Sequence, residues 1–272
     1  MAVAVELGSG LELRTHARTG QFTDQTAGQA PGYLQGNVVI LPQRYAADFL
    51  QFCLNNPKPC PLIGLSQPGD TGIPSLGADI DVRTDISLYR VFMDGALEDH
   101  PADILDRWSD DLVTFVLGCS FTFEEALIQA GFGVRHIEQG RNVPMFRTNI
   151  ETIPGGIFRG PLVVTMRPCR REDYPHIFDL CARYPHAHGA PVYTGDPARI
   201  GIADLQSPDY GDPVDVADHE IPVFWACGVT TQAAIETARP SLCITHAPGH
   251  MLVTDVASDT PPKLVTGMTS FQ

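Results

Sequence analysis

The chain has 272 residues, of which 43% are hydrophobic and 18% charged, and a net charge of −14 at pH 7. This length allows one large domain or two moderate ones, and the composition is ordinary for a globular protein with a sizeable core. The acidic balance argues against binding to nucleic acid or to an anionic membrane, because both attract basic proteins.

The cationic residues and the cysteines narrow the chemistry further. All 18 cationic residues except Lys58 and Lys263 are arginines, which favours carboxylate binding over imine chemistry. No P-loop motif is present, so we expect no cofactor. The seven cysteines include no C-x-x-C pair, and no signal segment or stretch of about 20 apolar residues occurs. We therefore expect a soluble, cytoplasmic protein with free thiols.

The first third of the chain predicts a strand, a helix and two further strands. Residues 36–42 form a β-branched run that stops at Pro42, and residues 43–56 place apolar side chains at helical intervals. A loop rich in proline and glycine follows, with a short strand at 62–65. Residues 79–95 alternate apolar and polar side chains, which is typical of a strand.

The remaining segments alternate between strands and helices. A helix closed by Gly131 is expected after residues 112–119, with Thr122 and Glu125 as a capping box. The predicted helices are 101–111, 122–131, 171–185 and 230–240. The predicted strands are 112–119, 134–140, 142–150, 160–168, 221–228, 241–245 and 251–255. This alternation predicts an α/β fold, with a mixed sheet and helices on its faces.

Cys119 and Cys227 each stand where an apolar strand gives way to a helix. Ligands of open α/β sheets gather at such junctions, and a helix N-terminus favours an anion such as a thiolate. We expect both cysteines to meet in one cleft of a common sheet, as candidate catalytic residues. The alternative is that they are buried core residues, which is how Cys53, Cys169, Cys181 and Cys243 are interpreted.

His246 and His250, in a loop beside Pro248 and Gly249, are candidates for proton transfer. They are less suited to a metal, because proline and glycine interrupt any helix between them and no acidic ligand completes a set. Four arginines lie in or beside predicted strands and are candidates for binding an acidic substrate, with surface salt bridges as the alternative. They are Arg83, Arg135, Arg147 and Arg167.

Several long motifs carry a resemblance to a known family. They include GCSFTFEEAL, VRHIEQGRNVPMFRTNI, HGAPVYTGDPARIGI, FWACGVTTQAA and ITHAPGHMLVTD. With shorter motifs such as DIDVRTD and VVTMRP, they extend over residues 26–255. The chain resembles the "putative hydro-lyase" family, a largely bacterial group to which the mammalian mitochondrial D-glutamate cyclase is related.

The resemblance implies loss of water from a small carboxylate or amino acid, such as closure of D-glutamate to 5-oxo-D-proline. It is compatible with a main domain of residues 1–143 and 221–272 and an inserted α+β subdomain of residues 144–220. Cys119, Cys227, His246 and His250 would then transfer protons, and the four arginines would hold the α-carboxylate. Ser120, His188, Tyr193 and Trp225 complete the expected substrate-binding set. Tyr193 and Ser87 depart from the family pattern, which has histidine and proline there.

Two alternatives remain open. One is a cofactor-independent racemase or epimerase that uses the two cysteines as acid and base on opposite faces of an α-carbon. The other is a non-catalytic protein that binds small carboxylates. All three hypotheses expect a small acidic molecule as the partner, and a homodimer is a further expectation.

Overall fold

The computed structural model describes residues 8–262, and its strands form two sheets in which every pairing is antiparallel. The larger sheet has the order β2-β5-β1-β10-β3-β4, and β11 also pairs with β1. Its strands are β1 (Tyr33–Pro42), β2 (Leu62–Leu65), β3 (Tyr89–Met93), β4 (Ala96–Asp99), β5 (Leu112–Gly118), β10 (Cys243–His246) and β11 (Leu252–Ala257).

The smaller sheet has the order β6-β7-β9-β8. Its strands are β6 (Met145–Glu151), β7 (Pro161–Arg170), β8 (Tyr193–Thr194) and β9 (Glu220–Ala226). All four come from one continuous part of the chain, which overlaps the segment expected as an inserted subdomain. The division into two domains remains a prediction.

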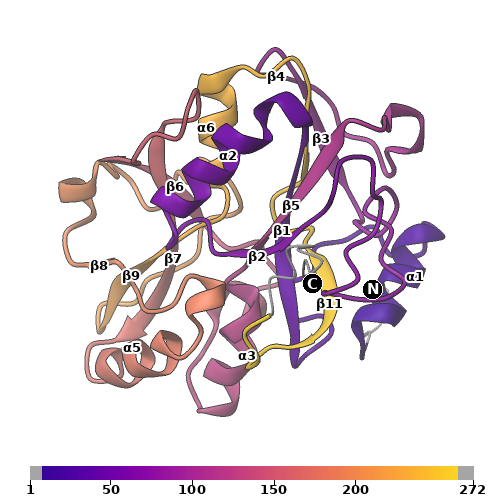
Figure 1. The fold of residues 1–272 in the computed structure, drawn as a ribbon. Coiled ribbons are helices and arrows are strands. Elements are labelled where there is room, and N and C mark those ends of the chain that lie inside the picture. The colour runs from indigo at the N-terminus through magenta and orange to yellow at the C-terminus, as the bar shows by residue number, and fades with distance from the viewer. Residues whose placement is uncertain (1–7, 263–272) are drawn as a thin grey trace, which may run out of the picture.

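Helices pack on both sheets. The α-helices are α1 (Gly10–Arg18), α2 (Gln43–Asn55), α3 (Phe121–Gln129), α4 (Arg135–Glu138), α5 (Tyr174–Ala182) and α6 (Thr230–Ala238), with 3-10 turns at Leu105–Arg107, Pro185–Ala187 and Pro197–Ile200. Figure 1 shows α2 and α6 side by side on the larger sheet, where Phe49, Phe52 and Ile235 share a core with Val39 and Phe115. The predicted α/β fold with helices on the sheet faces is confirmed.

A separate core cluster joins the two sheets. It contains Met145 and Val163 from the smaller sheet, Ala233 from α6, and both Cys119 and Cys227. The loop between β10 and β11 contributes Met251 to the same cluster. These two strands pair with successive parts of one edge of β1, so the loop between them passes close to the middle of that strand.

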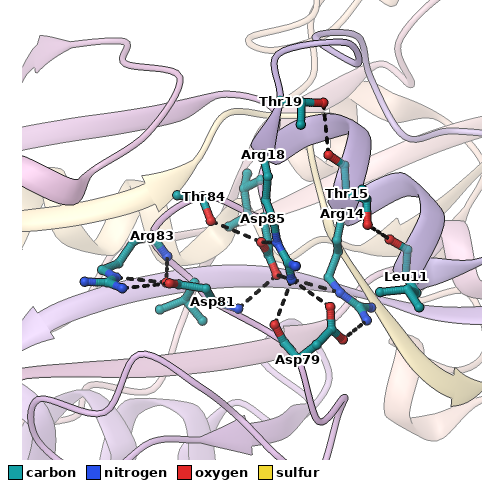
Figure 2. Close-up of polar contacts among 12 residues, drawn as sticks. Leu11, Arg14, Thr15, Arg18, Thr19, Asp79, Asp81, Arg83, Thr84 and Asp85 are labelled. Carbon is teal, nitrogen blue, oxygen red and sulfur yellow. Dashed lines mark hydrogen bonds and ion pairs between the residues drawn. The ribbon is translucent and has the colours of Figure 1, made fainter.

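The helix α1, which the sequence patterns did not predict, is fixed by ion pairs. Ser9 caps its N-terminus, and Arg14, fully buried, pairs with Asp79 and Asp255. Figure 2 shows Arg18 reaching Asp79 and Asp85 beside it. Asp79, Asp81 and Asp85 lie in a segment of turns and bends rather than in the strand expected from residue 79. The carboxylates of Asp81 and Asp85 accept from nearby backbone N–H groups, and all three acids pair with arginines, which favours this irregular backbone.

Three other local expectations were wrong. Residues 101–111 form only a 3-10 turn at Leu105–Arg107, and residues 134–140 form the short helix α4 instead of a strand. The expected capping box is absent, because Thr122 lies inside α3 and its hydroxyl bonds to the backbone of Gln35. Within residues 8–262, no helix is long and apolar enough to cross a bilayer.

Candidate functional site

The two cysteines come from different sheets and line the same cavity. Cys119 follows β5 in the larger sheet and Cys227 follows β9 in the smaller one, so the expectation of a common sheet was wrong. Their predicted convergence is confirmed, because both line an internal cavity of about 20 Å³. The other lining residues are Asn37, Ser120, Phe121, Val143, Met145, Thr165, His188, Val229, Gly249 and Met251.

Glycines beside the cysteines allow this close approach. A Cβ atom on Gly118 would lie 1.7 Å from the carbonyl oxygen of His186. A Cβ atom on Gly228 would lie 2.3 Å from the side-chain nitrogen of Asn37. Any side chain at either position would force the neighbouring backbone or amide away. The motifs LGC and ACG therefore fit two tightly packed strand-to-helix turns.

Both thiols are protonated at neutral pH. Burial raises the pKa of Cys119 to about 12 and that of Cys227 to about 11. The backbone N–H groups of Phe121 and Val229 bond to the two sulfurs and act in the opposite direction. Each cysteine thus receives an N–H from the residue two positions later, at the start of α3 or α6. Desolvation outweighs these bonds, so the two groups are proton donors rather than thiolates.

His188 supplies a neutral imidazole to the cavity. It has a left-handed backbone with φ of 74°, and its Nδ1 lies 2.8 Å from the carbonyl oxygen of Lys58. Because a carbonyl only accepts, Nδ1 carries the proton, and Nε2 is left as an acceptor. Burial lowers the pKa of His188 to about 4, so the ring is uncharged at neutral pH.

Arg167 does not line the cavity but donates hydrogen bonds to two residues that do. It donates from Nη2 to Ser120 Oγ at 2.9 Å and from Nη1 to Thr165 Oγ1 at 3.1 Å. Its guanidinium lies over the ring of Trp225 and pairs with the buried carboxylate of Glu124. Burial alone would raise the pKa of Glu124, but His136 and Arg167 hold it below its usual value. Arg167 therefore orients Ser120, while Trp225 covers the arginine and does not line the cavity.

The other three predicted arginines lie away from the cavity, and each has an acidic partner. Arg83 pairs with Asp81, as Figure 2 shows. Arg135 pairs with Glu138 and Glu220, and Arg147 pairs with Glu236 and bonds to Tyr210. Their assignment to substrate binding remains a prediction, with no geometric support from the cavity.

The two predicted histidines flank the cavity without lining it. His246 is buried at the end of β10, its Nδ1 in hydrogen-bond contact with the backbone of Val38, and burial lowers its pKa to about 4. His250 lies between Gly249 and Met251, which do line the cavity, and burial lowers its pKa as well. Its Nδ1 lies 2.9 Å from the hydroxyl of Ser87.

Tyr193 is also outside the cavity. Its hydroxyl donates to the carbonyl of Asp196, and its ring packs against Phe224 of β9. The departure from histidine at this position therefore lies on the strand β8, away from the two thiols. Among residues 8–262, no group of three or more potential ligands could hold a metal ion.

Eight of the twelve residues that line the cavity were not among the predicted site residues. Asn37 lies in an apolar strand, Thr165 in another, and Met145 and Met251 have no chemical signature. Asn37 donates to the carbonyls of Leu117 and Gly118, which ties β1 to the Cys119 turn. A polar residue in the run GNVVIL was the one available signal, because a buried amide needs partners.

Phe121 separates the cavity from a second hollow. It lines both the cavity and a pocket of about 260 Å³, whose wall includes Gly32, Gln35 and Ile128. The cavity has room for about one water molecule, whereas ligand sites usually measure about 300–1,000 Å³. A substrate therefore needs the cavity to widen, and Phe121 is the side chain between it and the larger pocket.

Known proteins resemble this chain over nearly its whole length. A family model described as D-glutamate cyclase matches residues 113–255. A protein named "Putative hydro-lyase" from Bordetella pertussis is 57% identical over 256 residues, which cover 94% of this chain and 92% of its own. Relatives with the same name from Jannaschia sp. and Verminephrobacter eiseniae are 58% and 55% identical, over 91% and 90% of this chain and 93% and 89% of their own.

Proposed function

Because the chain belongs to the D-glutamate cyclase family of hydro-lyases, we propose that it removes water from a small amino acid, closing D-glutamate to 5-oxo-D-proline. The enzyme is of the lyase class. The observation that carries the proposal is the meeting of two protonated thiols and one neutral imidazole in a single small cavity.

The reaction needs both an acceptor and a donor of protons. The ammonium group must lose two protons as its nitrogen attacks the γ-carboxyl carbon, and the departing oxygen must gain two to leave as water. His188 can accept a proton at Nε2, because its Nδ1–H is held by Lys58. A thiol of Cys119 or Cys227 can donate one to the departing oxygen, and the second proton of the nitrogen passes to the same oxygen. The proton taken up by His188 then returns to the thiolate, so no net proton is gained or lost, and no cofactor is required.

The surroundings suit this chemistry. The cavity is small and its lining residues are largely buried, so bonds to developing charge are stronger there than in solvent. Ser120, oriented by Arg167, presents its hydroxyl as a donor for a carboxyl oxygen. The buried Glu124 neutralises Arg167, which leaves the cavity without a fixed net charge from this pair.

The direct test is incubation of the purified protein with D-glutamate and, separately, with L-glutamate in deuterated water. Formation of 5-oxo-D-proline without deuterium at Cα supports the proposal. Cys119→Ser and Cys227→Ser should lower kcat by roughly 10²–10⁴-fold if the thiols transfer protons. Cys169→Ser is the matched control, because Cys169 is buried outside the cavity and should retain activity.

The same geometry favours one alternative, a two-cysteine racemase. Two protonated thiols lining one cavity could act on opposite faces of an α-carbon once one of them is deprotonated. The deuterium experiment separates the two reactions, because racemisation exchanges the Cα hydrogen with solvent whereas cyclisation leaves it in place. Exchange without ring closure would replace the cyclase proposal by this one.

A further inference from the structure

Arg90 on β3 differs from the arginines that the sequence singled out. Its Nη1 donates to the side-chain oxygen of Gln232 at 3.1 Å, and Gln232 donates in turn to the carbonyl of His246 at 3.3 Å. Gln232 is fully buried and lies in the first turn of α6, just after Cys227. A neutral amide thus holds the guanidinium in one orientation.

No carboxylate of residues 8–262 contacts Arg90, and Glu236 on α6 acts on its charge only from farther away. Arg83, Arg135, Arg147 and Arg167 each pair with a carboxylate within 4.0 Å, whereas Arg90 has no such partner among residues 8–262. Its Nε is buried and has no acceptor in that part of the chain. A partly buried charge that no carboxylate contacts directly is costly, and an anion bound in contact with it would relieve that cost.

The free edge of the guanidinium has the geometry of a carboxylate site. Since Nη1 is held by Gln232, Nε and Nη2 form the remaining edge of the guanidinium, and its Nε is buried without an acceptor. This edge presents two parallel N–H groups, which match the two oxygens of a carboxylate. A lysine would supply charge at this place but not the paired donors.

Strand register places this edge near the cysteine cavity. Arg90 stands opposite Thr245, which stands opposite Val39, and opposed residues of neighbouring strands share a face. Val39 packs in the core under α2 and α6, so Arg90 lies on the face covered by α6. Asn37, which lines the cavity, is two residues along β1 on that same face. Two strand spacings and two residues along the strand put the backbone of Arg90 about 12 Å from that of Asn37. The long arginine side chain can bring the guanidinium closer to the cavity than its backbone is.

We propose that Arg90, held by Gln232, binds the α-carboxylate of the amino-acid substrate at the margin of the cavity formed by Cys119 and Cys227. This inference rests on the proposed function for its substrate class. With the α-carboxylate held there, the γ-carboxyl group and the amine can extend toward the thiols and His188, which are the groups able to move protons.

The test measures binding apart from turnover. Glutarate carries both carboxylates of glutamate but no amine, so it can bind without reacting. Its dissociation constant is measured by calorimetry for the wild type and for Arg90→Gln, Arg90→Lys and Arg107→Gln, each checked for its melting temperature. We expect Arg90→Gln to weaken glutarate binding more than tenfold, Arg90→Lys to weaken it less, and Arg107→Gln, at an arginine that pairs with Asp99, to leave it unchanged.

Kinetics with D-glutamate supply the second readout. In Arg90→Gln, KM should rise more than tenfold while kcat changes less. Unchanged glutarate affinity in a folded Arg90→Gln or Arg90→Lys variant, or no glutarate binding by the wild type, would overturn the inference. A wild type that binds glutarate through Arg90 but forms no 5-oxo-D-proline would overturn the proposed reaction and leave the carboxylate site standing.

Discussion

At the scale of single residues, the site is built from groups kept uncharged by burial. Cys119 and Cys227 have pKa values raised to about 12 and 11, and His188 has one lowered to about 4. All three lose charge for one reason, which is that the cavity offers little solvation for an ion. Their ability to give or take a proton depends on the charge of the bound substrate, because an ammonium or carboxylate group changes the electrostatic potential in the cavity.

The thiols should therefore resist modification in the folded protein. With pKa values near 12 and 11, less than about one in a thousand of either thiol is ionised at pH 8. We expect Cys119 and Cys227 to react with Ellman's reagent at least 100-fold more slowly than the same cysteines in guanidinium chloride. Rapid labelling of either residue in the native protein, located by mass spectrometry, would contradict this.

His188 should make stability depend on pH. The folded state keeps its pKa at about 4, against about 6.5 when exposed, so below pH 6.5 the unfolded chain binds a proton that the folded chain does not. The contribution of His188 to the free energy of unfolding is complete above pH 6.5 and is lost as the pH falls toward 4. The part lost by pH 5 is about 2 kcal/mol.

The variant His188→Asn tests this contribution. Asparagine tolerates the left-handed backbone and does not titrate, so the fall in the free energy of unfolding between pH 7 and 5 should be smaller by about 2 kcal/mol. Urea unfolding at several pH values measures it. His176→Asn, at an exposed histidine, is the control, and an equal change in both variants would refute the assignment.

At the scale of elements, the α1 helix is attached through buried charge. Arg14 pairs with Asp79 and Asp255 and also donates to the carbonyl of Val253 on β11. Arg14→Met should lower the free energy of unfolding by about 3 kcal/mol, because it leaves the fully buried carboxylate of Asp85, 3.7 Å from Arg14, without one of its two arginine partners. Arg107→Gln, which breaks a more exposed pair with Asp99, should cost about 0–1 kcal/mol. Urea denaturation compares them, and equal losses would contradict the role of Arg14.

The elements that the sequence predicted best are those with a strong apolar period. The strands β5 and β9 and the helices α3 and α6 fall where apolar runs and turn residues agree, so the two cysteine turns were found. The helix α4 was missed because its four residues are too few to show a period, and His136 is buried against Glu124. The placement of β5 and β9 in separate sheets depends on contacts between residues far apart in the sequence, which local patterns do not show.

The site was predicted only where chemistry leaves a trace in the sequence. Cysteines between a strand and a helix carry such a trace, and so does His188 in its glycine-rich loop. Arginines carry no such trace, because a sequence does not show whether a guanidinium group has an acidic partner. Only the structure shows that Arg83 pairs with Asp81 whereas Arg90 bonds to Gln232. The motif YRV around Arg90 was interpreted simply as part of a strand.

At the scale of the whole molecule, the candidate site lies between two sheets, and Phe121 is the lining residue that it shares with the larger pocket. Phe121→Leu should open the way between the outer pocket and the cavity and raise the rate at which Ellman's reagent modifies Cys119 at least tenfold. Phe123→Leu is the matched control, since Phe123 is buried on the same helix without lining either space. Equal labelling rates in the two variants would show that the entry path lies elsewhere.

A cavity that holds about one water molecule must widen before an amino acid enters, so binding competes with closure. The apparent dissociation constant then equals the intrinsic one divided by the fraction of molecules that are open. If one molecule in a hundred is open, affinity is weakened about a hundredfold, which corresponds to about 2.7 kcal/mol. The weakening of substrate binding would thus measure the free energy needed to open the cavity between the two sheets. As the substrate concentration is raised, the observed binding rate would level off at the rate of opening.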